Sequence, residues 1–389
     1  MREDLIARLA QNTALREREQ LRRRLRHIDQ VDGPFVWSQG QRLVSFCSND
    51  YLGLSQHPRV IAALRDADVV GSGSAHLICG HRREHARLEE ALAEWTGRER
   101  AVLFSTGYMA NLGVLQALFG KNDVCVQDKL NHACLLDGAA LAGATLLRYV
   151  HADIDSATRQ LQSHGHAAAL LATDGIFSMD GDAAPLAELA SLCTDEHATL
   201  MVDDAHGLGV VGPDGAGSVA AAGLNASHVP VLMATLGKAL GTFGAFVAGS
   251  QALVDGLTQF ARPYIYTTAM PPALAAAAHA AVQVAREESW RREKLAALIA
   301  RFRTGAAQLD LPLMPSATAI QPLLLGEPAA ALRLSAHAEQ AGLLVTAIRP
   351  PTVPRLKARL RITLSAWHEE TQVDRLLAVL ADGMAASRL

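Results

Sequence analysis

The sequence predicts an α/β fold, with a large, mostly parallel sheet domain followed by a smaller C-terminal α+β domain. Half of the 389 residues are hydrophobic, which is enough to fill a large core. Between residues 101 and 234, short apolar runs alternate regularly with helical patterns. That alternation is typical of βαβ units, in which helices cover both faces of a parallel sheet.

The N-terminal part predicts a surface helix, a strand and a second helix. Leucines and an isoleucine recur at helical spacing among many charges, which predicts an amphipathic helix from residue 1 to about 28. A strand is expected at 41–46 and a helix at 85–97, where a glycine ends it. The arginine run Arg22–Arg24 is interpreted, on charge pattern alone, as a solvated face of the first helix.

The expected sheet strands are the apolar runs, at residues 101–104, 123–126, 145–149, 167–173, 198–203, 229–234 and 245–250. A helix at 183–197 is one of those between them, and a long alanine-rich helical region is expected at 271–309. Further strands and helices are expected at 319–325, 329–341, 359–364 and 369–384. We therefore divide the chain into an N-terminal helix and strand segment at 1–47, an α/β domain at 48–275 and an α+β domain at 276–389.

The composition argues against several classes of function. The formal charge of −3 is close to neutral and gives no pull toward nucleic acid or an anionic membrane. The five cysteines are scattered without a C-x-x-C pair, which suits a reducing compartment. The N-terminus has no apolar core of a signal peptide, and the apolar stretch 271–285 falls short of the roughly 20 residues that span a bilayer. We expect a cytoplasmic protein without nucleic-acid or membrane partners.

Open α/β sheets bind ligands beyond the carboxyl ends of their strands, so the residues after each strand are the first candidates. After the first expected strand, a hydroxyl pair and Gly107 open a helix whose free N–H groups can hold an anion; alone, this pattern predicts only a capped helix. The fifth strand ends at Asp203 and Asp204, and two acids there need a positive partner or solvent. Lys238 follows the sixth strand between glycines, placed to attack a carbonyl, although lysines are common in surface turns.

The combination is far more specific than its parts. An anion site, an acid and a lysine on strand ends are what pyridoxal 5'-phosphate requires, because it needs a phosphate site, a carboxylate at its ring nitrogen and a Schiff-base lysine. The motifs SNDYLGL, TGYMAN, DGIFSMDGD, VDDAHGLG and TLGKALG resemble those of the α-oxoamine synthases, over roughly residues 17 to 380. The resemblance implies a fold-type-I pyridoxal-phosphate-dependent transferase, which joins an amino acid to an acyl thioester with loss of carbon dioxide.

The resemblance also implies roles around the cofactor ring. Lys238 would bind the cofactor as a Schiff base and later remove the α-proton of the amino acid. Asp203 would pair with the ring nitrogen, and His206 would bond the phenolic oxygen with Ser178 nearby. His132 would stack on the ring face and border the substrate.

Further roles concern the phosphate and the partner subunit. Backbone groups of Gly107 and Tyr108, with Thr235, would hold the phosphate. The family's active sites lie at a homodimer interface, so Thr268 is expected to reach the phosphate bound by the neighbouring subunit.

The segments AIRPPTVP and RLRITLSAWH are most similar to family members that condense L-alanine with pimeloyl-CoA, or with a pimeloyl carrier protein, in biotin biosynthesis. Asn49 and Arg361 would hold the alanine carboxylate, for which the bidentate arginine fork is suited. Arg22 and Thr352 would contact the acyl substrate.

The chain departs from the family pattern in three places. Asp174 stands where relatives usually have glutamate, so a contact from that carboxylate is in doubt. The glycine-rich loop is shortened around Ser74 and Ala75, and we assign no binding role there. Beyond Pro354 the chain reads RLK where relatives usually carry a glycine, which would reshape the acyl entrance.

Several alternatives stay open. An aminotransferase or another fold-type-I lyase would share the lysine and the acid, and a silent binding protein would share only the fold. Within the family, the nearest rivals use glycine with acetyl-CoA or serine with a long-chain acyl-CoA. His81 and His85 are spaced to ligate a metal, but no third ligand is evident, so these two and His76 are interpreted as helix-surface histidines without a metal.

Overall fold

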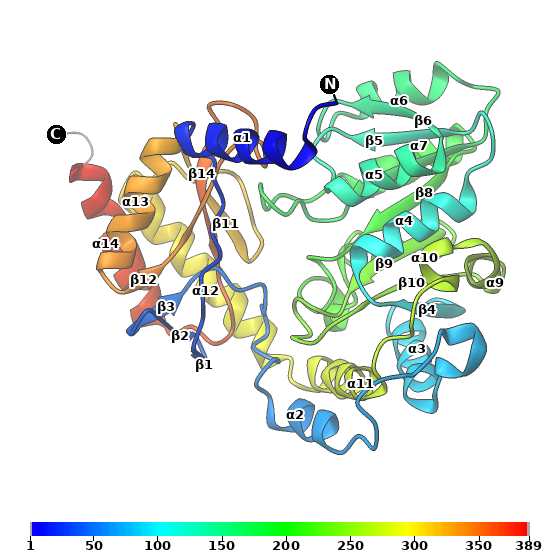
Figure 1. Cartoon of the computed structure of the whole chain (residues 1–389), viewed down its shortest axis with the longest axis horizontal. Coiled ribbons are helices and arrows are strands. Elements are labelled where there is room, and N and C mark those ends of the chain that lie inside the picture. The colour runs from blue at the N-terminus through cyan, green and yellow to red at the C-terminus, as the bar shows by residue number, and fades with distance from the viewer. Residues whose placement is uncertain (1, 387–389) are drawn as a thin grey trace. The chain divides into compact units, whose positions relative to one another are not determined.

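The computed structural model describes residues 2–386, which form two compact units (Figure 1). The sheet unit contains Asn49–Ser178 and Asp182–Lys294. The terminal unit contains the chain up to Ser48, the short segment Met179–Gly181 and the chain from Leu295 onward. This division differs from the expected boundaries: the N-terminal segment belongs with the C-terminal part, and residue 275 lies inside a helix of the sheet unit.

The sheet unit is built on a seven-stranded sheet, counted within residues 2–386, in the order β4-β10-β9-β8-β7-β5-β6. Its strands are β4 (Arg100–Phe104), β5 (Val124–Asp128), β6 (Thr145–Tyr149), β7 (Ala169–Asp174), β8 (Thr199–Asp203), β9 (Val231–Thr235) and β10 (Ala245–Gly249). β10 is antiparallel to β4 and β9, and the other neighbouring strands pair in parallel. The expectation of a mostly parallel sheet is confirmed.

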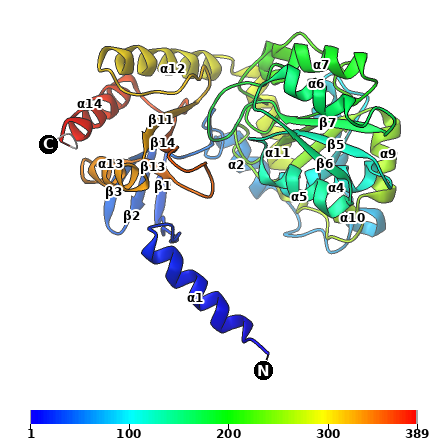
Figure 2. The same ribbon diagram turned by 90° about the horizontal axis from the view of Figure 1, so that it is seen from above.

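Helices cover both faces of this sheet (Figure 2). The α-helices of the sheet unit are α2 (Pro58–Arg65), α3 (Arg83–Trp95), α4 (Gly107–Leu118), α5 (Ala133–Ala142), α6 (Ile154–Gln162), α7 (Leu186–Asp195), α8 (Ser218–Ala221), α9 (Gln251–Phe260), α10 (Arg262–Ile265) and α11 (Pro272–Glu287), of which α2 packs on α11. Alternate residues of a strand serve opposite faces: Met201 packs with the residues of α4, α5 and α9, whereas Leu200 packs with those of α6 and α7. The continuous apolar runs follow from this burial on both faces.

The terminal unit contains two smaller sheets, with strand orders β1-β2-β3-β12 and β11-β14-β13. Its strands are β1 (Gln30–Asp32), β2 (Phe35–Ser38), β3 (Gln41–Ser45), β11 (Ile320–Gly326), β12 (Leu343–Leu344), β13 (Thr346–Ile348) and β14 (Ala358–Thr363). Helices α13 (Pro328–Gln340) and α14 (Glu370–Ala386) belong to it, and α12 (Trp290–Gln308) enters it from the sheet unit. Among residues 2–386, no helix is both long and apolar enough to cross a membrane.

Two helical expectations need correction. The region 271–309 is not one helix, because the chain leaves helical geometry at Glu288 between α11 and α12. The first helix, α1 (Leu5–Arg18), begins after its cap Asp4 but ends at Arg18 rather than near the expected residue 28, and Gln20 takes a left-handed φ of 57°. The run Arg22–Arg24 therefore lies beyond the helix rather than on its face.

Candidate active site

A pocket of about 180 Å³ lies at the carboxyl ends of the parallel strands in the sheet unit. All eight residues that the sequence analysis places around the cofactor ring and the phosphate of the same chain line it: Gly107, Tyr108, His132, Ser178, Asp203, His206, Thr235 and Lys238. Five further residues complete the lining: Cys134, Asp174, Ile176, Ala205 and Met233. Residues from α4 and from the ends of β5, β7, β8 and β9 therefore meet at one place.

Asp203 is the buried acid of the pocket, at the last position of β8. Its Oδ2 accepts a hydrogen bond of 2.7 Å from the side-chain amide of Asn111, and its Oδ1 accepts one of 3.1 Å from the backbone of Ala205. Asn111 lies on α4 and also donates to the Cys134 sulfur at 2.9 Å. These two hydrogen bonds fix the orientation of the Asp203 carboxylate in the pocket.

Asp174 lies at the end of the neighbouring strand, directly paired with Asp203 in the sheet register. Its burial, followed by the charge of Asp203, raises its pKa well above the usual value for an aspartate. The carboxylate accepts the backbone N–H of His132 at 3.2 Å, so its doubted contact exists and is made to the backbone. The pocket therefore holds two acids, and burial together with the neighbouring Asp203 disfavours the charged form of Asp174.

His132 caps the N-terminus of α5, where its ring accepts the Cys134 backbone N–H at 3.3 Å. Burial lowers the pKa of His132, while the charge of Asp203 opposes that shift. The ring is therefore neutral near pH 7, which suits a flat side chain that packs against another ring.

α4 begins at the pocket with Thr106 as its cap, whose hydroxyl accepts the Met109 N–H at 3.2 Å. The N–H groups of Gly107 and Tyr108 open the helix and have no acceptor within it. Such a helix start attracts an anion through its dipole and its N–H groups. Thr235, at the end of β9, adds a hydroxyl to the same pocket.

The sequence analysis overlooked two supporting residues. Tyr51 is buried, and its hydroxyl shares a hydrogen bond of 2.7 Å with Nδ1 of His206. Asn111 is fully buried on the core-facing side of α4. Both stand in quoted motifs, SNDYLGL and TGYMAN, and a polar residue on an apolar helix face is the signal that could have identified Asn111.

The remaining predicted residues do not line this pocket. Thr268 is exposed in the segment after α10, and Asn49 accepts a hydrogen bond from the Tyr51 hydroxyl at 3.2 Å. In the terminal unit, Arg361 is buried on β14. Arg22 forms an ion pair with Glu17 at 3.0 Å, and it is Arg23, not Arg22, that donates to the Thr352 hydroxyl, at 3.1 Å.

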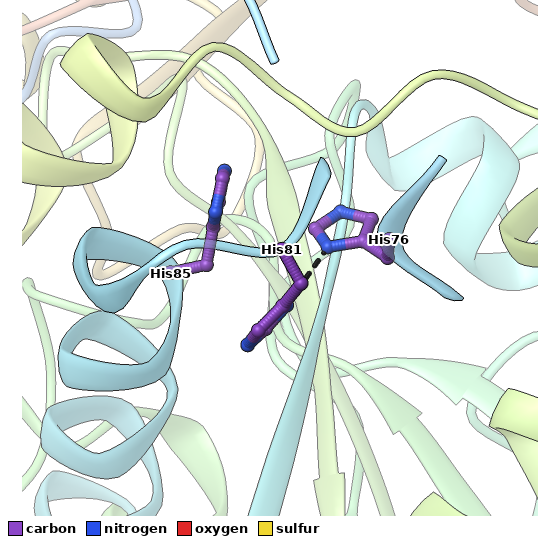
Figure 3. Close-up of side chains that lie close together, drawn as sticks. All are labelled: His76, His81 and His85. Carbon is purple, nitrogen blue, oxygen red and sulfur yellow. Dashed lines mark hydrogen bonds between the residues drawn. The ribbon is translucent and has the colours of Figure 1, made fainter. Parts of the chain in front are cut away.

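The interpretation of His76, His81 and His85 as helix-surface histidines is wrong for two of them. His85 is fully buried and His76 nearly so, while His81 is exposed. The three side chains are neighbours, with one nitrogen of each ring within 4.8 Å of the others, so a third neighbouring imidazole does exist (Figure 3). Sequence spacing missed it because His76 lies on a π-helical turn, His76–Gly80, which folds back toward α3.

The donor set of the pocket fits pyridoxal phosphate. The buried carboxylate of Asp203 lines the site at the end of β8, a lysine follows β9, and the start of α4, with its free N–H groups, lies beside them. These are the groups needed for a protonated ring nitrogen, a carbonyl carbon and a phosphate, respectively.

The chain is similar to known proteins over nearly its whole length. The family model for aminotransferase class I and II matches residues 41–380. The 8-amino-7-oxononanoate synthases of Alkalilimnicola ehrlichii and Pseudomonas putida are each 56% identical to it, covering 96% of both chains in the first case and 97% of both in the second.

Two solved structures extend the comparison. Serine palmitoyltransferase from S. paucimobilis, solved with a bound PLP–myriocin aldimine, has a TM-score of 0.93 and 27% identity over 99% of both chains. The 8-amino-7-oxononanoate synthase of Francisella tularensis has a TM-score of 0.77 and 28% identity, covering 89% of this chain and 99% of its own.

Proposed function

This chain belongs to the family of the 8-amino-7-oxononanoate synthases, and on that premise we propose that it condenses L-alanine with a pimeloyl thioester. The thioester carbon forms a bond to the alanine α-carbon, the thiol leaves, and the alanine carboxylate departs as carbon dioxide. The product is 8-amino-7-oxononanoate, an intermediate of biotin biosynthesis. The single observation that carries this proposal is the 56% identity over nearly the full length of relatives with that name.

The cofactor is pyridoxal 5'-phosphate, which when bound supplies an electron sink for the α-carbon of the amino acid. Asp203 would pair with the protonated ring nitrogen, and the hydrogen bonds from Asn111 and Ala205 support this role because they fix the orientation of its carboxylate. Lys238 would bind the cofactor covalently and, once released by alanine, take the α-proton on its Nζ.

Other pocket residues would orient the ring. His132, neutral at pH 7, would cover one face, and His206 would donate toward the phenolic oxygen with Tyr51 fixing its imidazole. Ser178 lies in the same lining. The N–H groups of α4 and the Thr235 hydroxyl would bind the phosphate, where an anion is stabilised by the helix start.

Substrate contacts outside this pocket follow from the family resemblance. Asn49 and Arg361 would bind the alanine carboxylate, and the buried position of Arg361 supports a role that uses its rigid fork. Thr352 would contact the acyl chain. Arg22 would contact it as well, although in this structure Arg22 pairs with Glu17 and it is Arg23 that bonds Thr352.

We also propose a cytoplasmic homodimer in which Thr268 contacts the phosphate of the neighbouring subunit. Its exposure, and its position outside the pocket of its own chain, support that role. The five cysteines are all unpaired, which accords with a reducing compartment.

Thiol release with matched substrates tests the activity. We expect turnover with L-alanine and pimeloyl-CoA or a pimeloyl carrier protein, and much slower turnover with glycine and acetyl-CoA. Serine and palmitoyl-CoA are the decisive control, because a serine palmitoyltransferase shares the fold over 99% of the chain. Faster turnover of either rival pair would assign the chain to another reaction of the same cofactor.

A further inference from the structure

Outside the pocket, the imidazoles of His76, His81 and His85 form a separate cluster in the sheet unit (Figure 3). One nitrogen from each ring lies within 4.8 Å of the others, and the ring centroids are 5.2, 5.1 and 5.4 Å apart. Three imidazoles on a tetrahedral Zn²⁺, with Zn–N bonds of about 2.0–2.1 Å, place their ring centroids roughly 5 Å from one another. We propose that this cluster binds a divalent first-row transition ion, with Zn²⁺ as its representative.

The facing nitrogens support this assignment. Nδ1 of His76 and Nδ1 of His81 are 2.9 Å apart, so one proton must lie between two lone pairs. When that proton moves to Nε2 of its own ring, both Nδ1 lone pairs become available, and a metal ion gains both nitrogens as ligands with a small adjustment of the rings.

The third ring is already oriented by its neighbours. Nε2 of His85 donates to the Met270 carbonyl at 2.7 Å, and a ligating histidine commonly fixes its tautomer through such a bond. Nδ1 is then the nitrogen with the lone pair, and it accepts the Arg82 backbone N–H at 2.9 Å. Ligation by His85 exchanges that hydrogen bond for a coordination bond, so we expect its contribution to be the weakest of the three.

The surroundings provide access and a carboxylate. His81 borders a cavity of about 520 Å³ together with Glu89, whose carboxylate lies 3.7 Å from Nε2 of His81. An ion can enter from this cavity, and water can complete its coordination, while Glu89 lies on the Nε2 side of His81 and can orient that ring. Three imidazoles without a thiolate suit zinc, nickel or copper rather than magnesium or calcium, which prefer oxygen.

A bound ion would clamp one loop of the sheet unit. It would join the π-helical turn at His76, the loop at His81 and the start of α3 at His85. The same loop is tied to Met270, whose carbonyl also accepts the Ser72 hydroxyl at 2.6 Å. The ion would therefore stiffen this segment without touching the pocket that contains Lys238.

Calorimetric titration of Zn²⁺ into chelator-treated, cofactor-loaded protein tests the site. We expect one ion per chain and a higher melting temperature, because a ligand that binds only the folded state stabilises it. His81→Gln, which changes the exposed ligand, should weaken binding by more than about tenfold through loss of one coordination bond. His76→Gln should do the same, whereas His164→Gln, at an exposed histidine elsewhere, should leave binding unchanged.

The cofactor absorbance separates this site from the pocket, and it should not change on addition of Zn²⁺ in any of these proteins. Equal affinity of the wild type and His81→Gln, or a shift in cofactor absorbance that accompanies binding, would overturn the proposal. In either case the three histidines would be a hydrogen-bonded cluster only. Neither result would bear on the condensation reaction, which is measured separately by thiol release.

Discussion

At the scale of single residues, the two adjacent acids at the end of β8 have different environments. Asp203 faces the pocket and accepts hydrogen bonds from the Asn111 side chain and the Ala205 backbone. Asp204 is fully buried on the other side, where it accepts the backbone N–H of Ser218 at 2.8 Å and the Ser218 hydroxyl. Consecutive strand residues point to opposite faces, so only one of these acids can serve the pocket.

Replacing Asp203 should therefore affect chemistry, and replacing Asp204 should not. Asp203→Asn removes the charge that would pair with the ring nitrogen, and loss of one partner from a buried ion pair costs roughly 3–5 kcal/mol. If that cost falls on the reacting carbon, exchange of the alanine α-proton in deuterated water should slow by roughly a hundredfold or more. Unchanged exchange would remove the assigned role from Asp203.

Asp204→Asn is the matched control. Burial raises the pKa of Asp204 to about 7, so the folded protein already favours an uncharged group there. The amide can still accept the Ser218 N–H and donate to the Ser218 hydroxyl, and α-proton exchange should stay close to that of the wild type. Because the raised pKa makes the wild type lose stability as pH rises from 3.8 toward 7, the variant should lack that loss in urea denaturation.

Eight residues of the pocket could be predicted because strand ends and family motifs both point to them. The supporting residues were less accessible to sequence reasoning. Asn111 contacts Asp203, and Tyr51 contacts His206, across 92 and 155 residues of chain, respectively. Such contacts depend on how a helix and a loop pack over the sheet. The pattern of residues along one sequence does not show which residues far apart in the chain come into contact.

At the scale of elements, an ion-pair network joins the loops that follow β5 and β6. His151 lies between Asp128, at 3.0 Å, and Asp182, at 2.7 Å. Asp128 also accepts the backbone N–H groups of Leu130 and Ala152. The loop after β5 leads to His132, so this network holds the segment that carries a pocket residue.

The network predicts a pH-dependent stability. Burial opposes the charge of His151, but the hydrogen bonds to Asp128 and Asp182 outweigh it and raise its pKa to about 10. The stabilisation of the folded state by protonated His151 is therefore complete below pH 6.5, the ordinary pKa of histidine, and declines as the pH rises toward 10. In urea denaturation near neutral pH, the free energy of unfolding of His151→Gln should be lower than that of the wild type by about 1.5–3 kcal/mol, the range for hydrogen bonds to charged groups, because the His151 side chain is only partly buried.

The difference between wild type and variant should shrink as pH rises through that window. His164→Gln, which replaces an exposed histidine, should show the wild-type pH profile. A constant difference between His151→Gln and the wild type would mean that packing against Phe177, rather than charge, accounts for the stabilisation.

Elements differ in how well the sequence predicts them. The buried strands were expected within two residues of their observed bounds, because burial on both faces gives them an unbroken apolar pattern. The bounds predicted for α1 were too long, because the apolar spacing in the sequence continues to Leu25 although helical geometry ends at Arg18. The break between α11 and α12 has neither a glycine nor a proline at Glu288 and Ser289, so no local signal marks it.

At the scale of the whole molecule, each of the two units is built from stretches that are not consecutive along the chain. The sheet unit begins at Asn49 and is interrupted at Met179–Gly181, a segment that belongs to the terminal unit. There Arg359, buried on β14, forms an ion pair of 2.8 Å with Asp180 and donates to the Met179 carbonyl at 3.1 Å. A division of the sequence into consecutive blocks could not describe this exchange, because three residues between β7 and α7 depend on a strand near the C-terminus.

The proposed homodimer predicts a role for Thr268 in binding the cofactor of the neighbouring subunit. If Thr268 donates to a phosphate bound by the neighbouring subunit, Thr268→Ala loses a hydrogen bond to a charged group, worth about 1.5–3 kcal/mol. The dissociation constant of the cofactor should then rise roughly ten- to a hundredfold. Thr267→Ala, at the half-buried neighbour, is the matched control and should bind as the wild type does.

A hybrid dimer decides which subunit Thr268 serves. One chain carries Lys238→Ala and the other Thr268→Ala, with different affinity tags for purification. If Thr268 acts across the interface, the site that retains Lys238 receives its threonine from the Lys238→Ala chain and binds the cofactor with wild-type affinity. If Thr268 acts within its own chain, that same site lacks it and binds as weakly as the Thr268→Ala homodimer. The second result, or a monomer by light scattering at working concentration, would contradict the shared site.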